Sequence, residues 1–176
     1  MILEIVALGE IAVSGTIKLI KRYREKIDCR FRADLIKSIE KKEKDTILID
    51  SLDLSDTDCI IEVGKGGIFA ALWDLGETIG TGIRINLKNI PVSQEIIEIC
   101  NYLDVNPYEL ESRGLFLFAV ESGYSFCENL KAAGYRAEII GFTTKDNDRI
   151  IYNGDSVRYI DKNRGKEELE RVFKNE

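Results

Sequence analysis

The sequence contains no histidine among its 176 residues. Imidazole is the side chain whose ordinary pKa lies near neutral pH, and it is also the commonest metal ligand. Its absence excludes Ser-His-Asp and Cys-His nucleophile pairs, histidine acid–base catalysis and every histidine-containing metal site.

Cysteine is sparse, and its spacing carries no metal or redox motif. Four cysteines lie far apart, without a C-x-x-C pair, at Cys29, Cys59, Cys100 and Cys127. They have apolar neighbours, as in Cys59-Ile60-Ile61 and Ile99-Cys100. Because free cysteine behaves as a small buried hydrophobe in a reducing compartment, we expect buried thiols rather than catalytic or metal-binding ones.

Long apolar runs and linkers are also missing. No stretch approaches the length of a membrane span, and the first residues carry Glu4 within their apolar stretch and no basic region, unlike a signal peptide. The cytoplasm is therefore the expected location. With only Pro91 and Pro107 and no repeat, the sequence predicts one compact domain over residues 1–176.

The charge balance argues against a nucleic-acid partner. Twenty-five basic and 31 acidic residues give a net charge of −6, whereas nucleic-acid binders usually carry a basic surplus. The basic residues that cluster over residues 18–44 are interrupted by acidic ones, which favours a solvated pair of helices over an RNA or anionic-lipid patch. We expect neither a nucleic-acid nor a membrane partner.

Strands and helices intermix along the chain. Apolar runs bounded by turn residues predict strands at 2–8, 59–63, 83–87, 115–120, 136–143, 149–152 and 156–160. The run at 115–120 is apolar on both faces, so a central place in the sheet is expected. Residues 146–148 are predicted to join two of these strands as a hairpin turn.

Helical periodicity accounts for much of the remainder. Helices are predicted from about Ser14, at 32–44, 68–75 and 93–103, from Ser122 or Ser125 to Gly134, and near 166–173, whereas residues 47–54 are ambiguous between helix and strand. The fold class expected is α+β, or layered α/β, with a mixed sheet flanked by helices.

One glycine-rich turn is a candidate binding site. Gly64-Lys65-Gly66-Gly67 lies between a predicted strand and a predicted helix. Glycines let the backbone approach a ligand closely, and the N-terminus of the following helix favours phosphate. The turn matches neither a Walker loop nor a G-x-G-x-x-G fingerprint. A turn that only packs helix against strand remains an equal alternative.

The surrounding motifs resemble the C-terminal domain of the aminoimidazole-ribonucleotide (AIR) synthetase superfamily, above all its hydrogenase-maturation dehydratases and AIR synthase-related proteins. In that family a Gly-Gly turn and helix precede an Ile-Pro-Val segment, a cysteine-bearing helix, an Asn-Pro stretch, a glycine turn and an apolar strand. The order and spacing agree with Gly66-Gly67-Ile68-Phe69, Ile90-Pro91-Val92, Glu98-Ile99-Cys100, Val105-Asn106-Pro107-Tyr108, Ser112-Arg113-Gly114 and Ile139-Ile140-Gly141. Residues 57–176 match well. Residues 1–56, the opening strand and helices, match more loosely, with Ser14-Gly15-Thr16 where a Glu-Gly-Thr is usual.

The resemblance implies a division of labour. In the family a separate N-terminal domain binds Mg²⁺ and ATP and usually forms the dimer, while the C-terminal domain supplies its glycine turn and one wall of the cleft. The common reaction transfers the ATP γ-phosphoryl group to an oxygen or selenium nucleophile, by positioning and metal assistance. ATP and Mg²⁺ would therefore be cofactors only together with a partner domain.

The sequence also departs from the family pattern. The family's Asp and Thr of the glycine turn fall at Glu62 and Gly64, and its Asn-Glu-Gly falls at Ser112-Arg113-Gly114. The aspartate-rich N-terminal metal domain and the dehydratase's cysteine-bearing tail have no counterpart in the sequence. The chain alone is therefore not expected to carry out the family's ATP chemistry.

Three functions follow as hypotheses. The first is a half-site protein that binds a phosphate-bearing ligand or pairs with an ATP-binding partner. Its anion-binding residues would be Gly64, Lys65, Gly66 and Gly67, with Arg113 as a second anchor. The second is an autonomous phosphoryl-transfer enzyme with a metal site drawn from Glu62, Asp74 and Glu77. The third is an oligomeric interaction module with an exposed sheet face. No catalytic acid or base is assigned. Glu111 and Arg113 face the cleft or form a surface ion pair; both alternatives are open.

Overall fold

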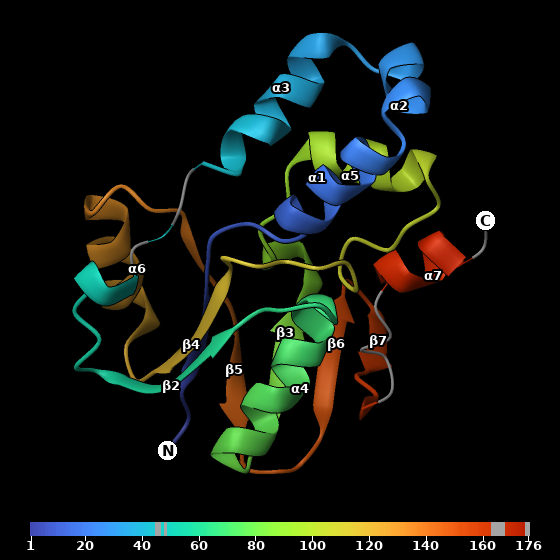
Figure 1. The fold of residues 1–176 in the computed structure, drawn as a ribbon. Helices are drawn as coiled ribbons and strands as arrows, with labels where there is room; N and C mark the ends of the chain where they lie inside the picture. Colours follow the sequence, from blue (N-terminus) through green and yellow to red (C-terminus); the bar gives the residue numbers. More distant parts are fainter. Residues whose placement is uncertain (45–46, 48, 163–167, 175–176) are drawn as a thin grey trace.

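The computed structural model describes residues 1–44, 47, 49–162 and 168–174. Over these residues one mixed sheet has the strand order β2-β4-β1-β5-β3-β6-β7 (Figure 1). The strands are β1 Glu4–Leu8, β2 Thr57–Glu62, β3 Gly82–Asn86, β4 Phe116–Val120, β5 Ala137–Thr144, β6 Arg149–Asn153 and β7 Ser156–Tyr159. The α-helices are α1 Val13–Arg22, α2 Arg24–Arg30, α3 Ala33–Lys42, α4 Gly67–Ile79, α5 Gln94–Tyr102, α6 Gly123–Ala132 and α7 Glu168–Lys174. The predicted α+β class is confirmed.

The first strand lies in the middle of the sheet. β1 pairs antiparallel with β4 on one side and with β5 on the other. Each strand of this centre has apolar side chains on both faces, since Leu117 and Phe118 of β4 are both fully buried but belong to different core clusters. As predicted for residues 115–120, β4 lies inside the sheet, between β2 and β1.

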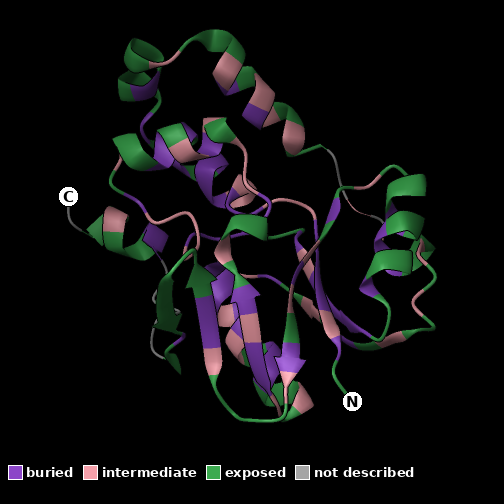
Figure 2. Ribbon diagram, turned by 180° about the vertical axis from the view of Figure 1, so that it is seen from behind, coloured by how far each residue is buried: buried purple, intermediate pink, exposed green. Residues whose placement is uncertain are grey.

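Helices cover the two faces unequally. Apolar residues of α1, α4 and α5 form the larger core cluster with one face of the sheet, including Ile83, Ile85 and Ile151. On the opposite face α6 packs against β1 and β5, and Phe126 and Leu130 close a smaller cluster with Phe118. Seen from behind in Figure 2, no described helix lies in front of β3, β6 and β7. That part of the sheet is open.

The predicted hairpin at residues 146–148 is wrong, although the turn itself exists. β3 lies between β5 and β6, antiparallel to the former and parallel to the latter. The carbonyls of Asp146 and Asp148 accept hydrogen bonds from the backbone N–H groups of Gly82 and Ile83. The turn therefore binds the start of β3 instead of pairing its own flanking strands. The antiparallel hairpin of this region is β6–β7.

The helices of the structure differ in part from the predicted ones. The additional helix α2 precedes α3, which occupies most of the predicted range 32–44. Within the ambiguous stretch 47–54, Ile49–Ser51 is a short 3₁₀ turn, and residue 48 lies outside the described residues. Residues 166 and 167 of the predicted closing helix also lie outside them, and α7 covers the rest.

Three of the four cysteines are buried as expected, but Cys29 is exposed on α2, so its predicted burial is wrong. Cys29 is on the charged surface of a short helix that has one buried residue, Ile27. Burial raises the pKa of Cys100 to about 11 and that of Cys127 to about 11, which suits structural thiols. No helix within the described residues is long and apolar enough to cross a membrane.

Candidate functional site

The glycine turn joins the end of β2 to the start of α4. Gly67 has a φ of +68°, which glycine adopts without strain. A Cβ atom there would lie 2.4 Å from the Tyr108 carbonyl oxygen and 2.8 Å from the Cα of Glu109. In contrast, a Cβ atom on Gly64 would meet nothing within 4 Å. Close packing thus accounts for Gly67, whereas Gly64 faces open space.

The chain itself satisfies part of the helix N-terminus. The N–H of Gly67 donates to the Gly64 carbonyl at 3.2 Å, and the N–H of Phe69 donates to the Tyr108 carbonyl at 3.4 Å. The Tyr108 ring stacks on Phe69 with centroids 5.4 Å apart. An anion at this helix end would consequently rest on Lys65 and the remaining N–H groups, fewer donors than an uncapped helix offers.

A second loop connects the glycine turn to α1. The N–H of Ser112 donates to the Gly64 carbonyl at 3.2 Å, and Ser112 Oγ accepts from the N–H of Ala12 at 2.7 Å. Ala12 precedes α1 with a φ of +62°. The loop around Ser112 therefore bridges the glycine turn and the start of α1, at the end of the sheet where β1 and β2 finish and β4 begins.

The structure brings Arg113 to this bridge, beside the glycine turn, and adds Lys18. Glu111 is fully buried, its Oε1 lies 3.4 Å from Arg113 Nε, and Lys18 Nζ lies 2.8 Å from both carboxylate oxygens. Of the two alternatives left open for Glu111 and Arg113, a surface ion pair does not describe Glu111, because its carboxylate is enclosed beneath the two cations. Sequence reasoning missed Lys18. The only available signal was its place one turn after Ser14-Gly15-Thr16.

Two positions at which the sequence departs from the family motifs touch each other. The N–H of Arg113 donates to Ser14 Oγ at 3.0 Å, and Ser14 Oγ donates to the Glu111 carbonyl at 3.2 Å. Where the family motifs carry glutamates, this chain has Ser14 and Arg113, which meet through the Ser14 hydroxyl and the Arg113 backbone N–H. The local charge at this bridge is therefore more positive than the family pattern implies.

The structure does not gather the carboxylates suggested for a metal site. Glu62 and Asp74 are exposed, and Glu77 forms an ion pair with Arg149, whose guanidinium carbon lies 4.1 Å from the centroid of the Trp73 ring. Over the described part of the chain, no group of three His, Cys, Asp or Glu side chains is placed to hold a metal ion. Trp73 stacks under this arginine and packs on the core.

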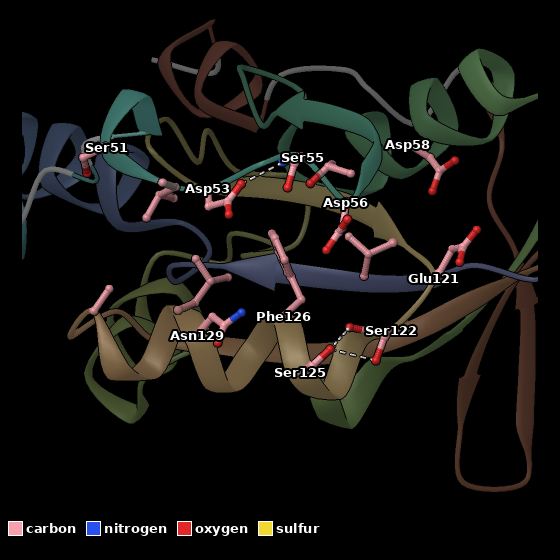
Figure 3. Close-up of a pocket in the computed structure, with 15 residues that line it drawn as sticks. Ser51, Asp53, Ser55, Asp56, Asp58, Glu121, Ser122, Ser125, Phe126 and Asn129 are labelled. Atoms are coloured by element: carbon pink, nitrogen blue, oxygen red, sulfur yellow. Dashed lines mark hydrogen bonds between the residues drawn. The ribbon is translucent and has the colours of Figure 1, made fainter.

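A cavity of about 760 Å³ lies away from the glycine turn, at the opposite end of β2 (Figure 3). Residues 51–58 form one wall and α6 the other. Among the described residues that line it, none is basic and four carry carboxylates: Asp53, Asp56, Asp58 and Glu121. Hydrogen bonds from Ser55 lower the pKa of Asp53 and favour its charged form. Because like charges repel, this cavity is unsuited to a phosphate.

Known proteins resemble the chain along most of its length. The model of the family "AIR synthase related protein, C-terminal domain" matches residues 5–153. A Methanocaldococcus jannaschii protein named "Putative hydrogenase expression/formation protein" is 28% identical over 154 residues, which cover 84% of this chain and 44% of that protein. The chain thus spans under half of that relative.

Two solved structures share the fold. Escherichia coli HypE superposes with a TM-score of 0.70 at 18% identity, over 97% of this chain and 52% of HypE. Thiamine-monophosphate kinase of Stenotrophomonas maltophilia superposes with a TM-score of 0.66 at 10% identity, over 86% of this chain and 50% of the kinase. Each neighbour is about twice as long as the part matched. Because the family model matches residues 5–153 and the fold agrees with it, the chain belongs to the AIR synthase-related C-terminal domain family.

Proposed function

We propose that this domain binds a phosphate-bearing ligand at Gly64–Gly67 and forms one half of an ATP-dependent site, completed by an ATP-binding domain. The observation that carries the proposal is the bridge from Gly64 to Ser112, which sets Arg113 beside the glycine turn. Lys65 in the turn and Arg113 next to it would supply positive charge where the backbone approaches closely.

The relatives support the proposal that a second domain completes the ATP-dependent site. One HypE structure contains ATP, and another is a complex of HypE with HypF. This chain corresponds to about half of HypE. Since the metal-binding carboxylates of phosphoryl transfer are not gathered in the described residues, we expect no ATP turnover by this chain alone. Turnover by the purified chain would instead support the autonomous enzyme.

Replacing Lys65 with alanine tests the site. Because a charge-assisted contact contributes about 1.5–3 kcal/mol, phosphate affinity should weaken about ten-fold or more. Calorimetry with Mg-ATP, ADP and AMP measures the change. Lys131→Ala, which removes a lysine from α6 on the other face of the sheet, is the matched control. Absence of saturable binding by the wild type at millimolar nucleotide would contradict the proposal.

A specific observation favours an interaction module as the second candidate. Paired residues of β5, β3, β6 and β7 place exposed apolar side chains on the face that α6 leaves open: Phe142 (47% exposed), Tyr152 (37%), Val157 (50%) and Tyr159 (59%). Arg84 of β3 pairs with Phe142 on one side and with Ile150 on the other, so the apolar patch is continuous only over β6 and β7. An exposed apolar sheet face is typical of an interface.

If this face binds a second copy, wild type should be dimeric by size-exclusion light scattering. Tyr159→Glu should then yield monomers with an unchanged circular dichroism spectrum, since a charge would be buried in the contact. Tyr124→Glu, at a 72% exposed position on α6, is the control. A monomeric wild type at high concentration would rule this interface out.

A further inference from the structure

Glu111 and its two cations form an unbalanced ion cluster. The Glu111 side chain is 1% exposed, whereas those of Lys18 and Arg113 are 48% and 61% exposed. One buried carboxylate thus faces two cations, so the cluster carries one excess positive charge in a chain whose net charge is −6. Arg113 meets the carboxylate through Nε, and about half or more of each cationic side chain is exposed to solvent.

Hydrogen bonds hold this cluster in place from two directions. The Glu111 carbonyl accepts from the N–H of Gly15 at 3.0 Å and from Ser14 Oγ at 3.2 Å. A Cβ atom on Gly15 would lie 2.9 Å from that same carbonyl oxygen, so the first turn of α1 is packed directly on the loop. The loop is in turn tied to Gly64 through Ser112. The two cations therefore sit on a fixed base and need little ordering to bind a ligand.

We propose that Lys18 and Arg113 form an oxyanion-binding clamp, positioned by Glu111, that takes a second anionic group of the ligand held at the glycine turn. The proposal rests on the proposed function, because the clamp borders that same turn. A guanidinium offers two parallel N–H donors to a phosphate or carboxylate, and an ammonium adds a compact charge. The ligand class is accordingly a phosphorylated small molecule that carries a further phosphate or carboxylate.

The test is an NMR titration of the full chain with inorganic phosphate and, separately, with malonate. Backbone signals of residues 14–18 and 111–114 should move saturably in wild type. Lys18→Met keeps the apolar stem and removes the charge, so these shifts should need about ten-fold more ligand, as they should in Arg113→Gln. Lys18→Arg should restore wild-type binding. A stronger response to phosphate or to malonate identifies which anionic group the clamp takes.

Lys65→Ala separates the clamp from the glycine turn. If the clamp exists, its signals should still move in this variant while those of residues 64–68 no longer do. Binding that is lost in Lys65→Ala but unchanged in both Lys18→Met and Arg113→Gln would overturn the clamp and leave the proposed function standing. If the signals of residues 14–18 and 111–114 move in wild type while those of residues 64–68 do not respond at all, the clamp stands and the proposed phosphate site at the glycine turn is overturned. Lack of saturable shifts at 14–18 and 111–114 with either anion overturns the clamp.

Discussion

Gly67→Ala is expected to lower the free energy of unfolding by about 3 kcal/mol or more, since a positive φ and a backbone clash act together. The φ of +68° strains an alanine, and its Cβ atom would lie 2.4 Å from the Tyr108 carbonyl oxygen. A flexible side chain could move away, but the atoms met here belong to the backbone of Tyr108 and Glu109. Urea unfolding followed by circular dichroism measures the loss.

Gly64→Ala is the matched control, in the same turn. A Cβ atom at Gly64 meets nothing within 4 Å and its φ is not positive, so the change should be within about 0.5 kcal/mol. Equal destabilisation by the two variants would show that the turn does not have the described backbone. Unchanged stability in Gly67→Ala would show that α4 and the loop at Tyr108 do not meet.

Phe118→Ala should cost about 3–5 kcal/mol of unfolding free energy, the usual range for a fully buried phenylalanine. Phe118 has no exposed surface and its ring centroid lies 5.1 Å from that of Phe126 on α6. The cluster between α6 and the sheet is the smaller of the two, so few neighbours can fill the void. Chemical denaturation with fluorescence detection provides the measurement.

Tyr124→Ala removes an aromatic side chain from the same helix at a 72% exposed position. Its effect should lie within about 0.5 kcal/mol, as expected of a surface site without special contacts. A small effect of Phe118→Ala would mean that α6 does not dock on the sheet. The cavity in Figure 3 would then lack the wall that α6 forms.

Sequence patterning predicted which segments are regular but not how they pair. The apolar run at 115–120 and the alternation at 83–87 are local signals, and both became strands. The insertion of β3 between β5 and β6 depends on backbone hydrogen bonds to Asp146 and Asp148, and such long-range pairing has no local pattern. The hairpin prediction failed for this reason.

For the candidate site too, the sequence predicted the local elements but not the long-range contacts between them. The Gly64–Gly67 turn lies between strand and helix as expected, and Arg113 lies beside it. The burial of Glu111 could not be foreseen, because charged side chains are taken as exposed unless a partner is known. Lys18 belongs to a basic stretch that composition assigned to solvent, and only the fold shows the carboxylate beneath it.

The central place of β1 has a consequence for synthesis. The N–H of Leu3, just before β1, donates to Thr143 Oγ1, 140 positions later, and both neighbours of β1 belong to the second half of the sequence. At a translation rate of about 5–20 residues per second, synthesis of β5 is finished roughly 7 to 27 seconds after that of β1. Until β4 is made, a strand with four buried residues has no neighbour in the sheet, and its second neighbour β5 follows later still. The nascent chain is therefore a natural client for chaperones until its last third has emerged.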